Sequence, residues 1–235
     1  MLLALTGLAA AAAASYAGYA SMAPQSQLYG RTLTRGRDPT QMALTFDDGP
    51  NDPHTLRLLD VLAAHKAKAT FFLIGKYVRR RPEIVRVIRD AGHAIGNHTY
   101  NHPNLIFASP KRVRRELDDC GKALEDAIGQ HQPLFRPPFG GRLPHVLATC
   151  RSLGLTPVMW SVTAYDWSAK SPDTIVDHVT RQVNARNHCA NIILLHDGGH
   201  LTFGADRSHT VEATRRLLEK YSAEGKNFVS IPELL

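Results

Sequence analysis

The chain alternates short apolar runs with longer amphipathic stretches, and this alternation limits the folds open to it. Seven apolar runs predict strands, at residues 42–46, 70–74, 93–95, 134–135, 156–160, 192–195 and 228–231. Six stretches between them predict helices, at residues 53–65, 82–91, 110–128, 144–153, 172–187 and 209–222. Strands that alternate with helices in this way indicate a parallel sheet covered by helices.

Serine-proline pairs support the helix predictions. Ser109-Pro110 and Ser171-Pro172 each place a capping side chain before a proline at the first helical position. Seven strands within 235 residues predict an α/β fold, a distorted or incomplete (β/α) barrel with parallel strands in a single domain. Catalytic residues of such barrels cluster at the C-terminal ends of the strands, so residues that follow the predicted strands are the first candidates for a site.

Two strings at such positions carry chemistry. Asp47 and Asp48 end the first predicted strand, and His98 and His102 follow the third at a spacing of four. We expect one helical turn to bring both imidazoles onto the same side. Two neutral imidazoles and one carboxylate form a three-ligand site for zinc or a similar ion, with positions left open for water and substrate. Each string alone is also typical of a turn or an exposed helix, but together they favour a metal site.

Three further strings follow in the chain: Arg136-Pro137-Pro138-Phe139, Asp166-Trp167 and Leu194-Leu195-His196. With them, residues 40–235 resemble the polysaccharide deacetylases of carbohydrate esterase family four, the NodB-homology group. Two positions depart from the family pattern. Phe139 replaces the commoner tyrosine, and Thr163 stands where the fourth motif usually has its first aspartate.

The resemblance implies a catalytic domain over residues 40–235 and the same barrel fold. It implies that Asp47 is the general base, and that Asp48, His98 and His102 are the metal ligands. We expect one divalent ion, zinc in the first place, with cobalt or another divalent ion as alternatives.

The remaining residues complete a route for hydrolysis of an acetamide. A metal-bound water, whose pKa falls from about 15.7 toward about 7, supplies the nucleophile, and Asp47 takes its proton. Arg136 beside this carboxylate would hold it ionised. His196 is the candidate acid for the departing amine, because imidazole titrates near neutrality. Asp166 would pair with His196 and raise the pKa of its imidazole.

Three side chains are candidates for substrate contact. Phe139 and Trp167 would form the face on which the sugar ring and the acetyl methyl rest, although aromatic residues are as often part of a core. Leu194 would form a pocket wall. His200 follows two glycines close to His196, and of the two interpretations, a side chain that lines the cleft and a loop residue, we favour the loop residue.

These residues predict a metal-dependent hydrolase that removes N-acetyl groups from N-acetylglucosamine units of a chitooligosaccharide- or peptidoglycan-type glycan. Two alternatives stay open. The same groups would cleave an O-acetyl ester, as on acetylated xylan. A non-catalytic glycan-binding domain would keep the cleft, but binding alone would not require the complete set of Asp47, Arg136, Asp166 and His196.

The net charge and the cysteine content limit the binding partners and the kinds of metal site that the sequence supports. The net charge of +7 at pH 7 favours anionic surroundings, and an anionic cell wall fits this better than nucleic acid, for which the sequence has no recognised motif. Cys120, Cys150 and Cys189 have no Cys-x-x-Cys spacing, which argues against a thiolate metal site. One disulfide plus one free thiol stays open. The sequence does not indicate the oligomeric state.

The first thirty residues contain no charged side chain. Residues 1–23 predict a signal peptide, with small-x-Ala sites ending at Ala17, Ala20 and Ala23, or a weak membrane anchor. Residues 24–39 predict a linker. We therefore expect export to the cell envelope, the periplasm or the extracellular space, with membrane association if residues 1–23 are retained.

Overall fold

A computed structural model describes residues 12, 14–185 and 190–235. At its centre lies a sheet ordered β5-β4-β3-β2-β1-β7-β6, with β8 paired to β1, and the pairings are parallel. The strands are β1 (Gln41–Gly49), β2 (Ala69–Leu73), β3 (Ala94–Asn97), β4 (Leu134–Phe135), β5 (Thr156–Pro157), β6 (Val162–Thr163), β7 (Asn191–His196) and β8 (Asn227–Phe228). Within the described chain β5 and β6 form the two edges and do not pair, so the barrel is incomplete, as the sequence predicts.

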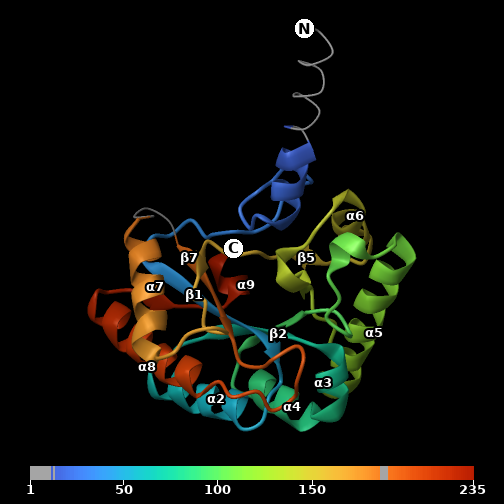
Figure 1. The fold of residues 1–235 in the computed structure, drawn as a ribbon. Coiled ribbons are helices and arrows are strands. Elements are labelled where there is room, and N and C mark those ends of the chain that lie inside the picture. Colours follow the sequence, from blue (N-terminus) through green and yellow to red (C-terminus); the bar gives the residue numbers. More distant parts are fainter. Residues whose placement is uncertain (1–11, 13, 186–189) are drawn as a thin grey trace, which may run out of the picture.

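Helices surround the outside of this sheet (Figure 1). They are α2 (His54–Ala64), α3 (Gly75–Arg80), α4 (Pro82–Asp90), α5 (Pro110–Ile128), α6 (Pro144–Ser152), α7 (Pro172–Asn184) and α8 (Ser208–Ala223). The short helix α9 (Ile231–Leu234) lies inside instead, where it packs with Ala43 and Phe72, and two 3₁₀ turns, η1 (Leu105–Phe107) and η2 (Pro138–Gly140), lie in connecting segments. The predicted caps are present, because the hydroxyls of Ser109 and Ser171 accept backbone N–H groups in the first turns of α5 and α7.

Two strand predictions were wrong in extent. The run 156–160 pairs as β5 only over its first two residues, because Val158 bridges Leu33 and Met159 donates its N–H to the Leu33 carbonyl. The run 228–231 ends as a strand at Phe228, because Ser230 forms a capping box with Glu233 and starts α9. The sequence analysis also missed β6 and α3, which are short elements. Residues 186 and 187 of the last predicted α7 turn lie outside the described residues.

Strand β1 positions the candidate site through its alternation. Met42, Leu44 and Phe46 pack into the cluster shared with the outer helices, so the intervening residues face the barrel interior. The parallel register between β1 and β7 places Asp47 opposite His196. Two candidate residues 149 positions apart in sequence therefore lie side by side at one end of the sheet.

The N-terminal segment packs onto the domain. Residues 14–22 are helical, and Ala20 and Ser21 are buried. The guanidinium of Arg142, itself 1% exposed, donates to the carbonyls of Ala23 (2.6 Å) and Ser26 (2.8 Å), and also to that of Gly140 (3.0 Å). Part of the predicted linker is thus held against the loop that follows β4.

Some predictions fall on residues that lie outside the described part of the chain. Residues 1–11 and 13 of the predicted signal peptide or anchor lie outside the described residues, as does Cys189. Among the described residues, no helix combines the length and apolar character that crossing a membrane requires. Cys120 and Cys150 are buried free thiols.

Replacing Arg142 with leucine should destabilise the fold. The substitution leaves three carbonyl groups without their guanidinium donor, so we expect the free energy of unfolding to fall by about 2–4 kcal/mol. Urea denaturation of Arg142→Leu and of the exposed control Arg115→Leu measures this. The control should stay within about 0.5 kcal/mol of the unmodified protein. Equal stability of the two variants would contradict the packing role of Arg142.

Candidate active site

A cleft of about 550 Å³ opens at the C-terminal ends of β1 and β7. Eight of the residues predicted from sequence line it: Asp47, Asp48, His98, His102, Phe139, Trp167, Leu194 and His196. The other two, Arg136 and Asp166, are buried against residues of the lining. A groove of about 650 Å³ along α5 contains none of the ten. The sequence prediction of where these residues gather therefore agrees with the structure.

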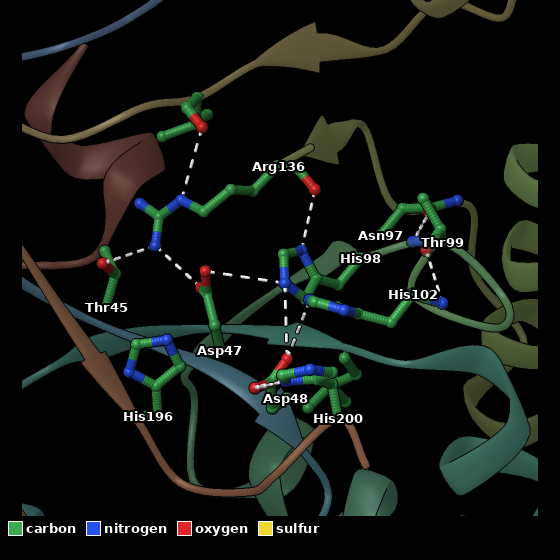
Figure 2. Close-up of polar contacts among 12 residues, drawn as sticks. Thr45, Asp47, Asp48, Asn97, His98, Thr99, His102, Arg136, His196 and His200 are labelled. Carbon is green, nitrogen blue, oxygen red and sulfur yellow. Dashed lines mark hydrogen bonds and ion pairs between the residues drawn. The ribbon is translucent and has the colours of Figure 1, made fainter. Parts of the chain in front are cut away.

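Asp47 lies between Arg136 and His98 (Figure 2). Nη1 of Arg136 donates to Oδ1 of Asp47 at 2.8 Å, and Oδ2 of the same carboxylate is 3.6 Å from Nε2 of His98. Arg136 follows β4 directly, as the sequence predicts. Asp47 and His196 were also expected just after their strands, but Asp47 lies within β1 and His196 is the last residue of β7. Burial raises the pKa of Asp47, and the Arg136 charge offsets this only in part, so the carboxyl is a stronger base than an exposed aspartate.

Asp48 faces the two predicted histidine ligands. Its Oδ1 is 3.2 Å from Nε2 of His102 and 3.6 Å from Nε2 of His98, and it has no hydrogen-bond donor. Nδ1 of His98 contacts the Arg136 carbonyl at 2.7 Å, which leaves Nε2 free to offer its lone pair. A buried carboxylate oxygen without a donor, next to two imidazole nitrogens, fits a divalent cation.

Both imidazoles of this group are held neutral. Burial lowers the pKa of His98 to about 4. Burial, together with the neighbouring His98, lowers the pKa of His102 to about 3. Because a metal binds the neutral imidazole, both residues have the protonation state that a ligand needs.

The expectation that a helical turn joins His98 and His102 was wrong. The segment is a loop after β3, and Thr99 and His102 have left-handed φ values of 65° and 63°. The Thr99 hydroxyl accepts the N–H of His102 at 3.0 Å, and the side chain of Asn97 accepts the N–H of Thr99 at 2.9 Å. These local bonds bring the two rings together with centroids 4.9 Å apart.

Glu116 shapes the same loop from a distance, and the sequence analysis missed it. It lies on α5, is 4% exposed, and accepts the backbone N–H groups of Tyr100 (3.1 Å) and Asn101 (2.8 Å). The one sequence signal was an acidic residue at a position where the helical period predicts the buried face.

His196 and Asp166 form the pair that the sequence predicts. Nδ1 of His196 is 2.8 Å from Oδ1 of Asp166. Oδ2 of Asp166 accepts hydrogen bonds from the backbone N–H of His196 (2.7 Å) and from the Thr210 hydroxyl (2.9 Å). Burial by itself would lower the pKa of His196. The Asp166 charge and hydrogen bond outweigh burial and raise the pKa to about 9.

The aromatic candidates face the cleft rather than the core. Phe139 is 46% exposed and Trp167 is 48% exposed, whereas Leu194 is 4% exposed and forms part of the wall. Phe139 adopts a left-handed φ of 57°, an uncommon conformation for a non-glycine residue. The sequence analysis missed Trp160, a further lining residue.

Thr163 is a structural neighbour of the cleft. Its hydroxyl accepts the indole N–H of Trp160 at 2.9 Å, and its backbone exchanges two hydrogen bonds with the Gln182 side chain. The residue that replaces the family aspartate thus orients a cleft-lining tryptophan.

His200 also enters the site, although the sequence analysis interpreted it as a loop residue. Together with Asp48 and His102 it forms a group whose ligand atoms lie within 4.8 Å of one another, close enough to hold a metal ion. The predicted ligand His98 is not a member of this group. The signal in the sequence was its place after Gly198-Gly199, next to a predicted catalytic strand end.

Comparison with known proteins finds a matching family model, related sequences and a related structure. The family model for polysaccharide deacetylase matches residues 34–158. A peptidoglycan-N-acetylglucosamine deacetylase of Bacillus cereus is 39% identical over 196 residues, 83% of this chain and 87% of that protein. A chitooligosaccharide deacetylase of Sinorhizobium fredii is 38% identical over 212 residues, 87% of this chain and 97% of that protein. A crystal structure of a peptidoglycan N-acetylglucosamine deacetylase aligns with a TM-score of 0.79 at 32% identity, covering 87% and 92% of the two chains.

Removing the Glu116 carboxylate should weaken metal binding from a distance. Glu116→Ala leaves two loop N–H groups without their acceptor, so the loop holds His98 and His102 less firmly, and the Kd for zinc should rise about 10-fold. Chelator competition measures this. Glu125→Ala, an exposed change on the same helix, is the control and should leave the Kd unchanged. Identical zinc affinity in Glu116→Ala would contradict the positioning role.

Proposed function

The chain belongs to the polysaccharide deacetylase family of enzymes, and we propose that it removes N-acetyl groups from N-acetylglucosamine units of a glycan. Peptidoglycan and chitooligosaccharides are the substrate classes that the names of its relatives give, and either would offer such units. The observation that carries this proposal is the placement of Asp47, bonded to Arg136 and directly across from His196 in the sheet register.

In this proposal Asp48, His98 and His102 hold one divalent ion, zinc by the match of two imidazoles and a carboxylate. When bound, the ion activates a water molecule and polarises the acetyl oxygen. The donors are buried and the histidines neutral, which supports this assignment.

Asp47 takes the proton from the attacking water. Its Oδ1 is fixed by Arg136, so Oδ2, on the side of His98, is the oxygen that points toward the ligand group. Arg136 does not titrate in the working range, and it therefore orients the base without competing for the proton. The raised pKa of Asp47 supports the role, because a base is most effective when its pKa approaches the working pH.

His196 delivers a proton to the departing amine. Nδ1 is engaged by Asp166, so Nε2 is the atom available for donation. A pKa of about 9 keeps the imidazole protonated at neutral pH. Phe139, Trp167 and Leu194 line the space beside it, where the sugar ring and the acetyl methyl would rest.

An amide is the bond that needs this acid most, because an amine leaves poorly without a proton. The ion pair that keeps His196 charged therefore favours N-acetyl over O-acetyl substrates. Since peptidoglycan lies in the cell envelope, we further propose export of the protein to that compartment.

Acetate release from three substrates tests the proposal. The zinc-loaded protein should act on chitooligosaccharide or peptidoglycan at least about 10-fold faster than on acetylxylan, and chelation should abolish the activity. Preference for acetylxylan would favour the O-acetyl alternative. No acetate release from any of the three would contradict the proposal.

Changing Asp47 to asparagine should distinguish the role of a general base from that of a metal ligand. The variant keeps the shape but loses the proton acceptor, so turnover should fall by about 10²–10⁴ while zinc content is retained. Zinc analysis and steady-state kinetics together measure this. Loss of the ion in Asp47→Asn, with retention in Asp48→Asn, would mean that the two roles are reversed.

The pH profile should report the His196–Asp166 pair. His196 must be protonated to act, so the rate should decline as pH rises through about 9. Without the carboxylate, Asp166→Asn should move this alkaline limb toward about 6.5, the ordinary pKa of histidine, with zinc content unchanged. The linked stability has the same sign, because the pair stabilises the fold fully below about pH 6.5 and loses this effect as pH rises through about 9. An unmoved limb in the variant would contradict the role of the His196–Asp166 pair and leave the proton donor unidentified.

A further inference from the structure

The loop after β7 approaches the Asp48 main chain unusually closely. A Cβ atom on Gly198 would lie 2.1 Å from the carbonyl oxygen of Asp48, and one on Gly199 would lie 2.7 Å from the Cβ of Ala205. Both distances are shorter than real Cβ contacts, so any larger residue would push the loop away. The two glycines therefore allow the chain to bring the next residue, His200, against Asp48.

The backbone of this loop is anchored by helix α3. The Tyr77 hydroxyl donates to the carbonyls of Gly199 (3.1 Å) and His200 (3.3 Å), and Nζ of Lys76 donates to the His200 carbonyl at 3.2 Å. Since the main chain is held by side chains of another element, the position of the His200 imidazole is set by the fold rather than by a free loop.

The imidazole of His200 completes a ring of donors around Asp48 (Figure 2). Its Nδ1 is 3.7 Å from Oδ2 of Asp48, and its ring stacks on that of His102 with centroids 4.6 Å apart at 25°. Ligand atoms bonded to one tetrahedral ion at about 2.0–2.2 Å lie about 3.3–3.6 Å from one another. The separation of His200 from Asp48 is close to this range, as are those of His98 (3.6 Å) and His102 (3.2 Å).

His200 differs from the other donors in its exposure and its partners. Its side chain is 33% exposed, against 2% for His98 and 4% for His102. Nδ1 of His98 is fixed by a carbonyl at 2.7 Å, whereas the distance from His200 to the carboxylate exceeds a hydrogen bond. His200 is therefore the donor on the solvent side, and its ring is placed by contacts with the rings of His102 and Phe139, at centroid distances of 4.6 Å and 5.2 Å.

We propose that His200 is an additional, exchangeable ligand of the metal ion. In the absence of substrate its Nδ1 joins Asp48, His98 and His102, and it yields this position when an acetyl oxygen enters the cleft. The proposal rests on the proposed function, because it assumes that the three buried donors hold an ion. It assigns a metal-binding role to a residue outside the five motifs that define the sequence resemblance.

Cadmium NMR tests the ligand set directly. The full chain, with isotopically labelled histidine nitrogens, is loaded with an NMR-active cadmium isotope, and scalar couplings between cadmium and imidazole nitrogens are recorded with and without saturating acetate, the reaction product. Three coupled histidines are expected without acetate. Two are expected with acetate, the His200 coupling being the one that is lost.

Variants assign the signals and keep the result independent of activity. His200→Ala should lose one coupling, retain those of His98 and His102, and raise the Kd for zinc about 10-fold. The matched control is Leu201→Ala, a change of the next residue, which is 85% exposed and should leave both readouts unchanged.

The contradicting outcomes are distinct. Couplings from His98 and His102 alone, without acetate, would overturn the proposal and leave the proposed function intact. A His200 coupling that persists in saturating acetate would overturn the proposal that His200 leaves the ion when acetate binds. Absence of coupling from His98 and His102 would overturn the metal site of the proposed function itself.

Discussion

The guanidinium of Arg136 is completely buried, and this residue ties the proposed base to one of the proposed metal ligands. It binds the Asp47 carboxylate and the Thr45 hydroxyl on β1, each at 2.8 Å, and it donates to the main-chain carbonyls of Val158 and Met159. The Arg136 carbonyl, in turn, fixes the ring of His98. Removing one partner of such a buried ion pair leaves an unpaired charge, which costs about 3–5 kcal/mol. One residue thus connects the proposed base, a proposed ligand and three strand ends.

Different surroundings give side chains of the same type different pKa values. Asp47 and Asp48 are adjacent in sequence, yet burial raises the pKa of Asp47, while the interaction with His200 and the charge of His196 outweigh the burial of Asp48 and lower its pKa. Among the histidines, burial holds His98 neutral, and Asp166 keeps His196 protonated. Pairs of like groups whose pKa values are driven apart are the usual sign of distinct acid, base and ligand roles.

Sequence reasoning located most of this site, because parallel strands bring residues at their C-terminal ends to one edge of the sheet. For Asp47, Arg136 and His196 that rule agreed with the roles that the family resemblance implies. It failed where the geometry depends on a loop or on a distant contact. The left-handed conformations of Thr99 and His102, and the buried Glu116 that accepts the N–H groups of Tyr100 and Asn101 in the same loop, have no local pattern strong enough to predict. His200 was set aside because only the folded chain reveals which main-chain atom its two glycines approach.

The central claim is that Asp48, His98 and His102 bind the ion, while Asp47 stays off it as the base. Anomalous diffraction at the zinc edge from crystals of the zinc-loaded protein tests this directly. We expect one anomalous peak within about 2.0–2.2 Å of Oδ1 of Asp48 and Nε2 of both histidines, with both Asp47 oxygens outside bonding distance. A peak bonded to Asp47, or a peak that none of the three proposed ligands touches, would contradict it.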